Sequence, residues 1–256
     1  MTFDANLTAC AGLVQHGDPD RFAATMASPL STRRRLFPLY AFNVEVARAP
    51  WVTKEPMIAE MRLQWWRDAL EEIAEGRPPR RHEVVTPMAR MLTPDQARAL
   101  DTLVAARRWD IGTEAFEDET ALWRYLDATT GTLLWTAAAS LGAPAGDEAA
   151  LRQTARAVAL ANWMLALPEL EARGKRPMHD GRPETLAVLA KGALTDLAAQ
   201  SVLSPAAHQA LLSGWRARHI LKTVSKHPQR VARAALVTPD LHRSITLIRA
   251  RLLGRI

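Results

Sequence analysis

The order of apolar and polar residues along the chain predicts a series of helices separated by short breaks. Apolar residues recur at the three- to four-residue spacing of a helix, and no run shows the alternating β-branched pattern of a strand. Segments that carry proline, glycine or a capping residue divide these stretches. The pattern predicts helices over residues 18–26, 31–49, 54–75, 93–111, 119–141, 147–167 and 204–225, and from 238 onward.

The predicted boundaries rest on residue types that favour helix ends. Asp18, Ser31, Thr93 and Ser204 are suited to cap helix N-termini, and Pro50 is expected to end or kink the second helix. Segments 77–87 and 172–183 are predicted loops, and Gly76 is predicted to stop the third helix. No linker or repeat divides the chain, so we predict one all-α domain of about ten helices over residues 1–256.

Two helical stretches are apolar around most of their circumference, at residues 36–49 and 157–167. A helix that is hydrophobic all round is normally buried, so both are predicted core helices. Helical bundles build their sites from side chains on facing central helices. We therefore expect a pocket between these two stretches.

Composition supports the helical prediction and limits the cellular setting. Alanine, leucine and arginine dominate, and these residues favour helices. The longest apolar runs, 133–141 and 157–167, are too short to cross a bilayer. The first residues show no secretory or organelle-targeting pattern. Cys10 is the only cysteine, which excludes an intrachain disulfide and a cysteine-based zinc site. We expect a cytoplasmic protein of bacterial type.

Charge is concentrated toward the C-terminus. Residues 204–256 hold ten Lys and Arg and one acidic residue, a net charge of +9 against +6 for the whole chain. Basic helices there favour an anionic partner, such as the inner face of a membrane or an acidic protein surface, and they are equally compatible with an ordinary solvated face. Trp215 is the only aromatic residue in this segment, and no nucleic-acid motif is present, so no nucleic-acid partner is expected.

Several short motifs follow one another in an order that resembles squalene/phytoene synthases. They are Asp20-Arg21-Phe22, Arg33-Arg34-Arg35, Leu39-Tyr40-Ala41-Phe42, Gln64-Trp65-Trp66-Arg67-Asp68, Gly131-Thr132-Leu133-Leu134, and Asn162 followed by Arg173-Gly174-Lys175. The resemblance implies an all-α isoprenoid synthase fold. It also implies an activity, the condensation of two prenyl diphosphates with Mg²⁺ held by two DxxxD motifs on facing helices. Aspartates at i and i+4 share a helix face, and Mg²⁺ prefers such carboxylate oxygens.

The chain departs from this family at both aspartate motifs. Aligned without gaps, the four carboxylate positions fall at Ala47 and Trp51, and at Ala166 and Leu170. Divalent cations cannot be held by apolar side chains without a large desolvation cost. We therefore predict no catalytic residue and no metal or other cofactor, with Mg²⁺ bound only if the protein is an enzyme after all.

One branch of the family lacks the same aspartates. The segments 41–47 and 61–66 are similar to the phytoene-synthase-like assembly factors of respiratory complex I, which are regarded as non-enzymatic. This similarity implies an assembly or scaffolding role, with a protein partner among complex I subunits. Two alternatives remain open: a Mg²⁺-dependent prenyltransferase acting on prenyl diphosphates, and a protein that binds an isoprenoid or other lipid.

Polar residues near the two core helices form the predicted remnant of the family's pocket. They are Arg21, Tyr40, Asn43, Glu45, Gln64, Arg67 and Asn162. They are expected either to bind a small polar group or to clamp helices together. Trp51, Trp65, Trp66, Trp135 and Trp163 predict an aromatic-rich centre, which would either line a lipid cavity or fill the core.

Overall fold

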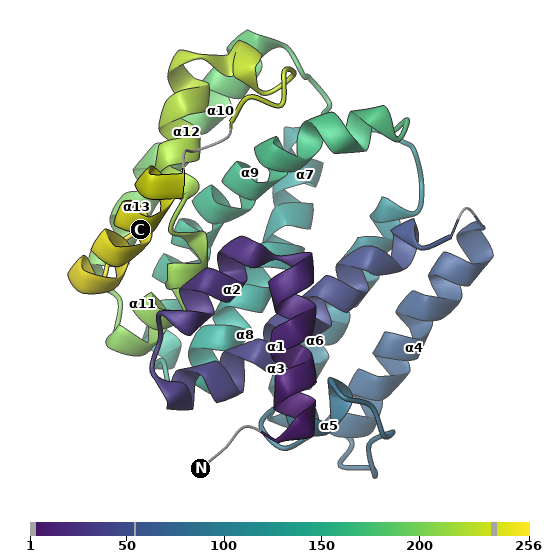
Figure 1. Cartoon of the computed structure of the whole chain (residues 1–256). Coiled ribbons are helices and arrows are strands. Elements are labelled where there is room, and N and C mark those ends of the chain that lie inside the picture. The colour runs from purple at the N-terminus through teal and green to yellow at the C-terminus, as the bar shows by residue number, and fades with distance from the viewer. Residues whose placement is uncertain (1–3, 54, 237–239) are drawn as a thin grey trace.

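The computed structural model describes residues 4–53, 55–236 and 240–256, and this part of the chain is built from helices without a strand. The predicted all-α architecture is confirmed (Figure 1). The α-helices are α1 (Ala5–Gly17), α2 (Pro19–Met26), α3 (Leu30–Arg48), α4 (Pro56–Ala74), α5 (Val85–Ala89), α6 (Pro94–Ala106), α7 (Glu119–Leu126), α8 (Thr132–Ser140), α9 (Glu148–Ala172), α10 (Pro183–Asp196), α11 (Pro205–Leu211), α12 (Ala217–Lys226) and α13 (Asp240–Leu253).

Local capping signals set most of the helix starts. The Asp18 carboxylate accepts a hydrogen bond from the Arg21 amide at the start of α2, and Ser204 caps α11 in the same way. Thr93 and Gln96 form a reciprocal capping box at the start of α6. The Ser31 prediction is wrong, because α3 already begins at Leu30, after Pro29. The predicted start at 238–239 lies outside the described residues.

Prolines act differently at two helix ends. As predicted, α3 ends before Pro50 and passes into a 3-10 turn, η1 (Ala49–Trp51). The predicted end of α9 at Leu167 is wrong, because the helix continues through Pro168 to Ala172. Leu167 and Leu170 are buried on either side of Pro168. Their packing holds the helix together despite the missing proline amide.

The predicted helix over 119–141 is present in two parts. One π-helical turn, η3 (Asp127–Gly131), joins α7 to α8. Such turns insert one extra residue per hydrogen-bonded ring, so they shift the face that the following side chains present, and they are frequent at functional sites. This turn matters below, because Thr129 and Thr130 line cavities.

Both predicted core helices are buried. In α3, Leu36 through Phe42 are all buried, and α9 buries most of its residues between Leu151 and Leu167. α3 packs against α1, and α4 packs chiefly against α6 at one edge of the molecule. α10, α12 and α13 lie at the opposite edge (Figure 1). No helix within the described residues has both the length and the hydrophobicity to cross a membrane.

Candidate functional site

A cavity of about 670 Å³ lies between α3 and α9. From α3 it receives Asn43 and Ala47, which are four residues apart and so share a helix face. From α9 it receives Asn162, Ala166 and Leu170, at the same four-residue spacing. Trp51, from η1, completes the set. The four positions at which the sequence lacks the expected carboxylates therefore face one cavity.

The residues of this cavity do not fit a Mg²⁺ cluster. Its carboxylates belong to Asp18, Asp110 and Glu169. Each already pairs with an arginine: Asp18 with Arg21 at 2.7 Å, Asp110 with Arg107 at 3.1 Å, and Glu169 with Arg173 at 2.6 Å. Within the described residues, no group of three or more His, Cys, Asp and Glu side chains is placed to hold a metal ion. Mg²⁺ needs several free oxygen ligands, and this lining does not provide them.

A buried polar cluster forms one wall of the cavity. The Tyr125 hydroxyl, from α7, donates to Asp110 at 2.7 Å, and Arg107 Nη1 donates to both Asp110 and Tyr125. Arg107 and Asp110 are the first and last residues of a 3-10 turn, η2 (Arg107–Asp110). Burial raises the pKa of Tyr125 well above its ordinary value, opposed by the charge of Arg107. The phenol therefore stays protonated and acts as a donor.

Aromatic rings surround this cluster. Trp109 and Phe116 stack at 4.1 Å, and the Tyr125 and Trp163 ring centroids lie 5.3 Å apart. Lys175 Nζ donates to the Asp110 and Gly112 carbonyls and lies 4.9 Å from the Trp51 ring centroid. Burial lowers the pKa of Lys175, opposed by the nearby charge of Asp110. The cavity thus combines an aromatic wall with a tightly hydrogen-bonded polar one.

A second cavity of about 290 Å³ adjoins the first. Asn43, Arg107 and Asn162 line both cavities, and Arg21 lines the smaller one. Tyr40 is fully buried and lines neither cavity: its ring lies 5.0 Å below the Arg21 guanidinium, and its hydroxyl donates to the Ala210 carbonyl at 3.4 Å. Of the predicted remnant residues, Arg21, Asn43 and Asn162 therefore come together, with Tyr40 supporting Arg21.

The placement of Glu45 in this pocket is corrected by the structure. Glu45 lies two residues from Asn43 and two from Ala47, which puts it on the opposite side of α3. It lines a separate small pocket with Trp65, Trp66 and His82. Its side chain pairs with Arg48 at 3.4 Å.

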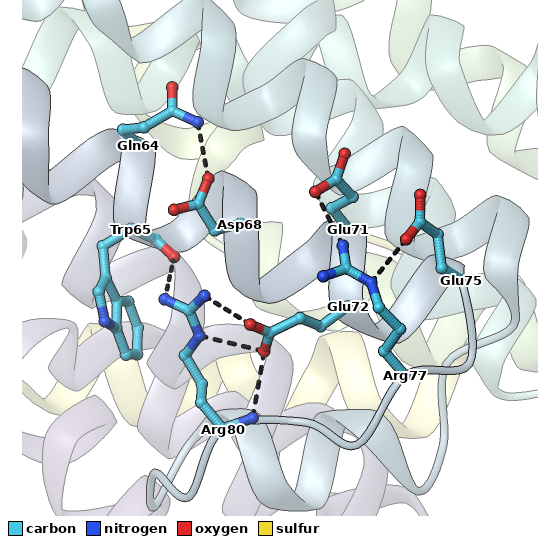
Figure 2. A network of polar contacts seen from close by, with 8 residues as sticks. All are labelled: Gln64, Trp65, Asp68, Glu71, Glu72, Glu75, Arg77 and Arg80. Carbon is cyan, nitrogen blue, oxygen red and sulfur yellow. Dashed lines mark hydrogen bonds and ion pairs between the residues drawn. The ribbon is translucent and has the colours of Figure 1, made fainter.

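The placement of Gln64 and Arg67 is corrected as well. Both lie where α4 meets α6, away from the central cavities. Arg67 makes a two-pronged ion pair with Asp101 of α6, at 2.7 and 3.0 Å, and so clamps two helices together. Gln64 donates to Asp68 at 2.7 Å, within the polar network along α4 that Figure 2 shows. α7 and η3, rather than α4, flank the larger cavity beside α3 and α9.

The predicted aromatic centre is divided between two places. Trp51 and Trp163 line the larger cavity. Trp65 and Trp66 instead pack around His82 at the pocket of Glu45. Trp135 is partly buried against the core.

Several residues of the site were not found by sequence reasoning. Arg107, Asp110, Tyr125 and Thr130 carry no distinguishing local signal, because arginine and aspartate three residues apart usually form a surface pair. Their role depends on η2, α7 and η3 converging in space. Asp18 was recognised only as a helix cap.

Comparison with known proteins agrees with this geometry. The sequence matches the family model of squalene/phytoene synthase over residues 14–245. A dehydrosqualene synthase crystal structure superimposes with a TM-score of 0.77 at 14% identity, covering 97% of this chain and 96% of that one. Squalene synthase HpnC from Alicyclobacillus acidocaldarius gives 0.71 at 14% identity, covering 88% and 94%. The fold is thus that of the isoprenoid synthases.

Several relatives that are similar in sequence are named as complex I assembly factors rather than as synthases. The NADH dehydrogenase (ubiquinone) complex I assembly factor 6 homolog of Drosophila melanogaster is 34% identical over 132 residues, which cover 49% of this chain and 39% of that protein. The human complex I assembly factor 6 is 26% identical over 134 residues, which cover 52% and 40%. The matched part spans only about two-fifths of these relatives. The family model, in contrast, covers most of the chain, which therefore belongs to the squalene/phytoene synthase family.

Proposed function

We propose that this protein is a non-catalytic member of its family that acts as an assembly or scaffolding factor for respiratory complex I. The observation that carries the proposal is the shared cavity of Ala47, Trp51, Ala166 and Leu170, in which no residue at a family metal position can bind a metal. The similar relatives are named complex I assembly factor 6, and for this reason we propose complex I as the complex that is assembled.

The chemistry of the cavity supports the non-catalytic part. Loss of diphosphate from a prenyl chain requires positive charge that neutralises the leaving group, which Mg²⁺ supplies in metal-dependent enzymes. Here the nearby carboxylates are engaged by arginines, and the four former ligand positions are apolar. The fold is retained while the metal ligands are absent.

A membrane contact through α13 fits the same role. Ile245, Ile248 and Leu252 expose more than half of their surface, Arg249 is exposed on the same helix, and Arg255 is exposed two residues beyond its end. An amphipathic helix with exposed arginines favours an anionic membrane surface. We propose a cytoplasmic protein that binds peripherally at the inner face of the membrane, where complex I is assembled.

The assembly role is tested by deleting the gene in the organism that encodes the chain. Membranes from the deletion strain are compared with wild type by native gel electrophoresis and by NADH:quinone oxidoreductase activity. We expect assembled complex I to fall and to return when the chain is expressed from a plasmid. Normal complex I levels in the deletion strain would rule out the role.

A second candidate function, binding of an isoprenoid or other lipid, is favoured by the size and aromatic wall of the larger cavity. Native mass spectrometry of the purified protein should then show an apolar ligand. Ala166→Trp fills the cavity and should remove this ligand, whereas Ala172→Trp adds the same ring to α9 outside the cavity and should keep it. A ligand-free spectrum of the unmodified protein contradicts this candidate.

A further inference from the structure

The helix α13 turns its apolar stripe away from the protein. Ile245, Ile248 and Leu252 follow one another at helical spacing, and each exposes more than half of its surface. The helix buries Ala250 on its opposite side. Surface helices normally pack their apolar stripe against the core, so this orientation is reversed. An exposed apolar stripe of this kind marks an interaction surface.

Polar contacts hold α13 in this orientation. Near the start of the helix, Arg243 forms an ion pair with Asp20 of α2. Near its end, Arg251 Nε donates to the Ala27 carbonyl at 3.0 Å. These two arginines therefore point toward the body of the protein, while the apolar stripe points toward solvent.

The residues after the helix are fixed as well. Ile256 is buried, and its amide donates to the Gln200 side chain at 2.8 Å. Its carbonyl accepts hydrogen bonds from the Gln200 amide and from the Arg218 guanidinium at 3.2 Å each. Because contacts hold both ends, α13 presents its apolar stripe to solvent without leaving the body.

The turn between α2 and α3 extends this apolar surface beyond α13. Arg251 contacts the turn at Ala27, which is 224 residues away in the sequence. Met26 and Leu30, on either side of Ala27, are 42% and 45% exposed. α13 and the turn lie on the same side of the molecule (Figure 1). Two distant segments thus supply exposed apolar side chains next to one contact.

The charge of both segments is entirely positive. Residues 21–44 and 241–256 each hold four arginines, and neither range holds a lysine, an aspartate or a glutamate. Asp20, which directly precedes the first range, is already paired with Arg216 and Arg243. An apolar surface bordered by cations alone complements an anionic lipid bilayer, because apolar side chains enter the interface while arginines bind the head groups.

We infer that α13 and the α2–α3 turn form one composite face that docks on an anionic bilayer, with α13 still attached to the body. The inference rests on the membrane contact proposed above and adds the second contacting segment. It requires Met26 and Leu30 to enter the interface together with Ile248 and Leu252. A helix that left the body would carry only its own side chains into the bilayer.

An environment-sensitive NBD label on single cysteines tests the composite face. In a Cys10→Ala background, labels at Met26→Cys and Leu252→Cys should both gain intensity and shift to shorter wavelength when vesicles of phosphatidylglycerol and phosphatidylcholine are added. Vesicles of phosphatidylcholine alone should produce no response. Met57→Cys replaces another exposed methionine, on α4 at the opposite edge of the molecule, and its label should not respond.

Leu30→Glu tests the turn without a label. Leu30 is the first residue of α3, where a negative charge favours the helix, so the substitution carries little risk to folding. Vesicle affinity should fall about tenfold, because an apolar contact is lost and a repelled charge is added. Met57→Glu places the same charge in the first turn of α4 and should leave the affinity unchanged.

The possible outcomes separate the inference from the role on which it rests. A response at Leu252→Cys without one at Met26→Cys would overturn the composite face and leave the membrane contact of α13 in place. No response at either position would overturn both. Equal losses in Leu30→Glu and Met57→Glu would also overturn the composite face. A label response that depends on protein concentration without vesicles would identify a second copy of the chain as the occupant and overturn it.

Discussion

At the scale of single residues, the site is defined by which charges are buried and paired. Asp110 is almost fully buried and accepts hydrogen bonds from both Arg107 and Tyr125. Asp95 and Arg98 show the same three-residue spacing at the surface, where both side chains are exposed. This contrast allows the energetic role of the buried cluster to be measured.

We predict that Asp110→Asn destabilises the protein by about 3 kcal/mol, because it leaves the Arg107 charge buried without a carboxylate. Asp95→Asn should cost less than about 1 kcal/mol, since exposed pairs contribute little. Urea unfolding of both variants measures the difference. If both variants lose the same free energy of unfolding, the buried cluster contributes no more to stability than the exposed pair.

Cys10 yields a prediction about reactivity and pH. Burial, followed by the charges of Glu83 and Asp4, raises the pKa of its thiol to about 12. Native protein at pH 8 should therefore react with iodoacetamide far more slowly than unfolded protein. Between pH 9 and 12 the unfolded state binds fewer protons, so the free energy of unfolding should fall with rising pH, and Cys10→Ala should show a smaller fall. Rapid alkylation of native protein would contradict this assignment.

At the scale of helices, capping residues determine where elements begin. Thr93 and Gln96 cap α6 reciprocally. We predict that Thr93→Ala lowers the free energy of unfolding by about 1 kcal/mol. Thr102→Ala, at an exposed site inside the same helix, removes the same atoms without removing a cap and should have a smaller effect. Thermal unfolding compares the two, and a larger loss for Thr102→Ala would contradict the capping argument.

The helices also show how far sequence alone could lead. Starts such as those at Asp18 and Thr93 were predictable, because a cap is a local interaction. The continuation of α9 through Pro168 was not, because tertiary packing of its neighbours outweighs the local preference. The π-helical turn before Thr132 likewise had no visible signal.

The residues of the candidate site likewise include some that the sequence could predict and others that it could not. Asn43 and Asn162 line the larger cavity, since each lies four residues before a position of the family motif on its own helix. Glu45 was misplaced because its place on the face of α3 was not considered. Arg107 and Arg216 could not be found, since their meeting at one cavity depends on contacts between distant segments.

At the scale of the whole molecule, an isoprenoid synthase fold is kept around a cavity that lacks the family's metal ligands. Its two edges differ: α4 lies at one, and the basic C-terminal helices lie at the other (Figure 1). The proposed role assigns membrane contact to the C-terminal edge and contact with a protein partner to the rest of the surface.

We predict that the protein sediments with vesicles that contain anionic lipids and not with neutral ones, and that added salt weakens this binding. Replacing Arg249 and Arg255 together by glutamine should reduce binding about tenfold or more, since each arginine near an anionic surface contributes about 1 kcal/mol. A variant with Arg62→Gln and Arg98→Gln, both exposed on other helices, should bind normally. Equal losses in the two double variants would contradict a specific role of α13 and the residues that follow it.

The central claim, that the fold is retained without metal-dependent catalysis, is tested most directly by a turnover measurement. Purified protein is incubated with Mg²⁺ and farnesyl or geranylgeranyl diphosphate, and the released diphosphate is quantified. The apolar residues Ala47, Trp51, Ala166 and Leu170 predict no release above that of the protein-free sample. Sustained release that Ala166→Trp abolishes would contradict the claim and establish the protein as an enzyme.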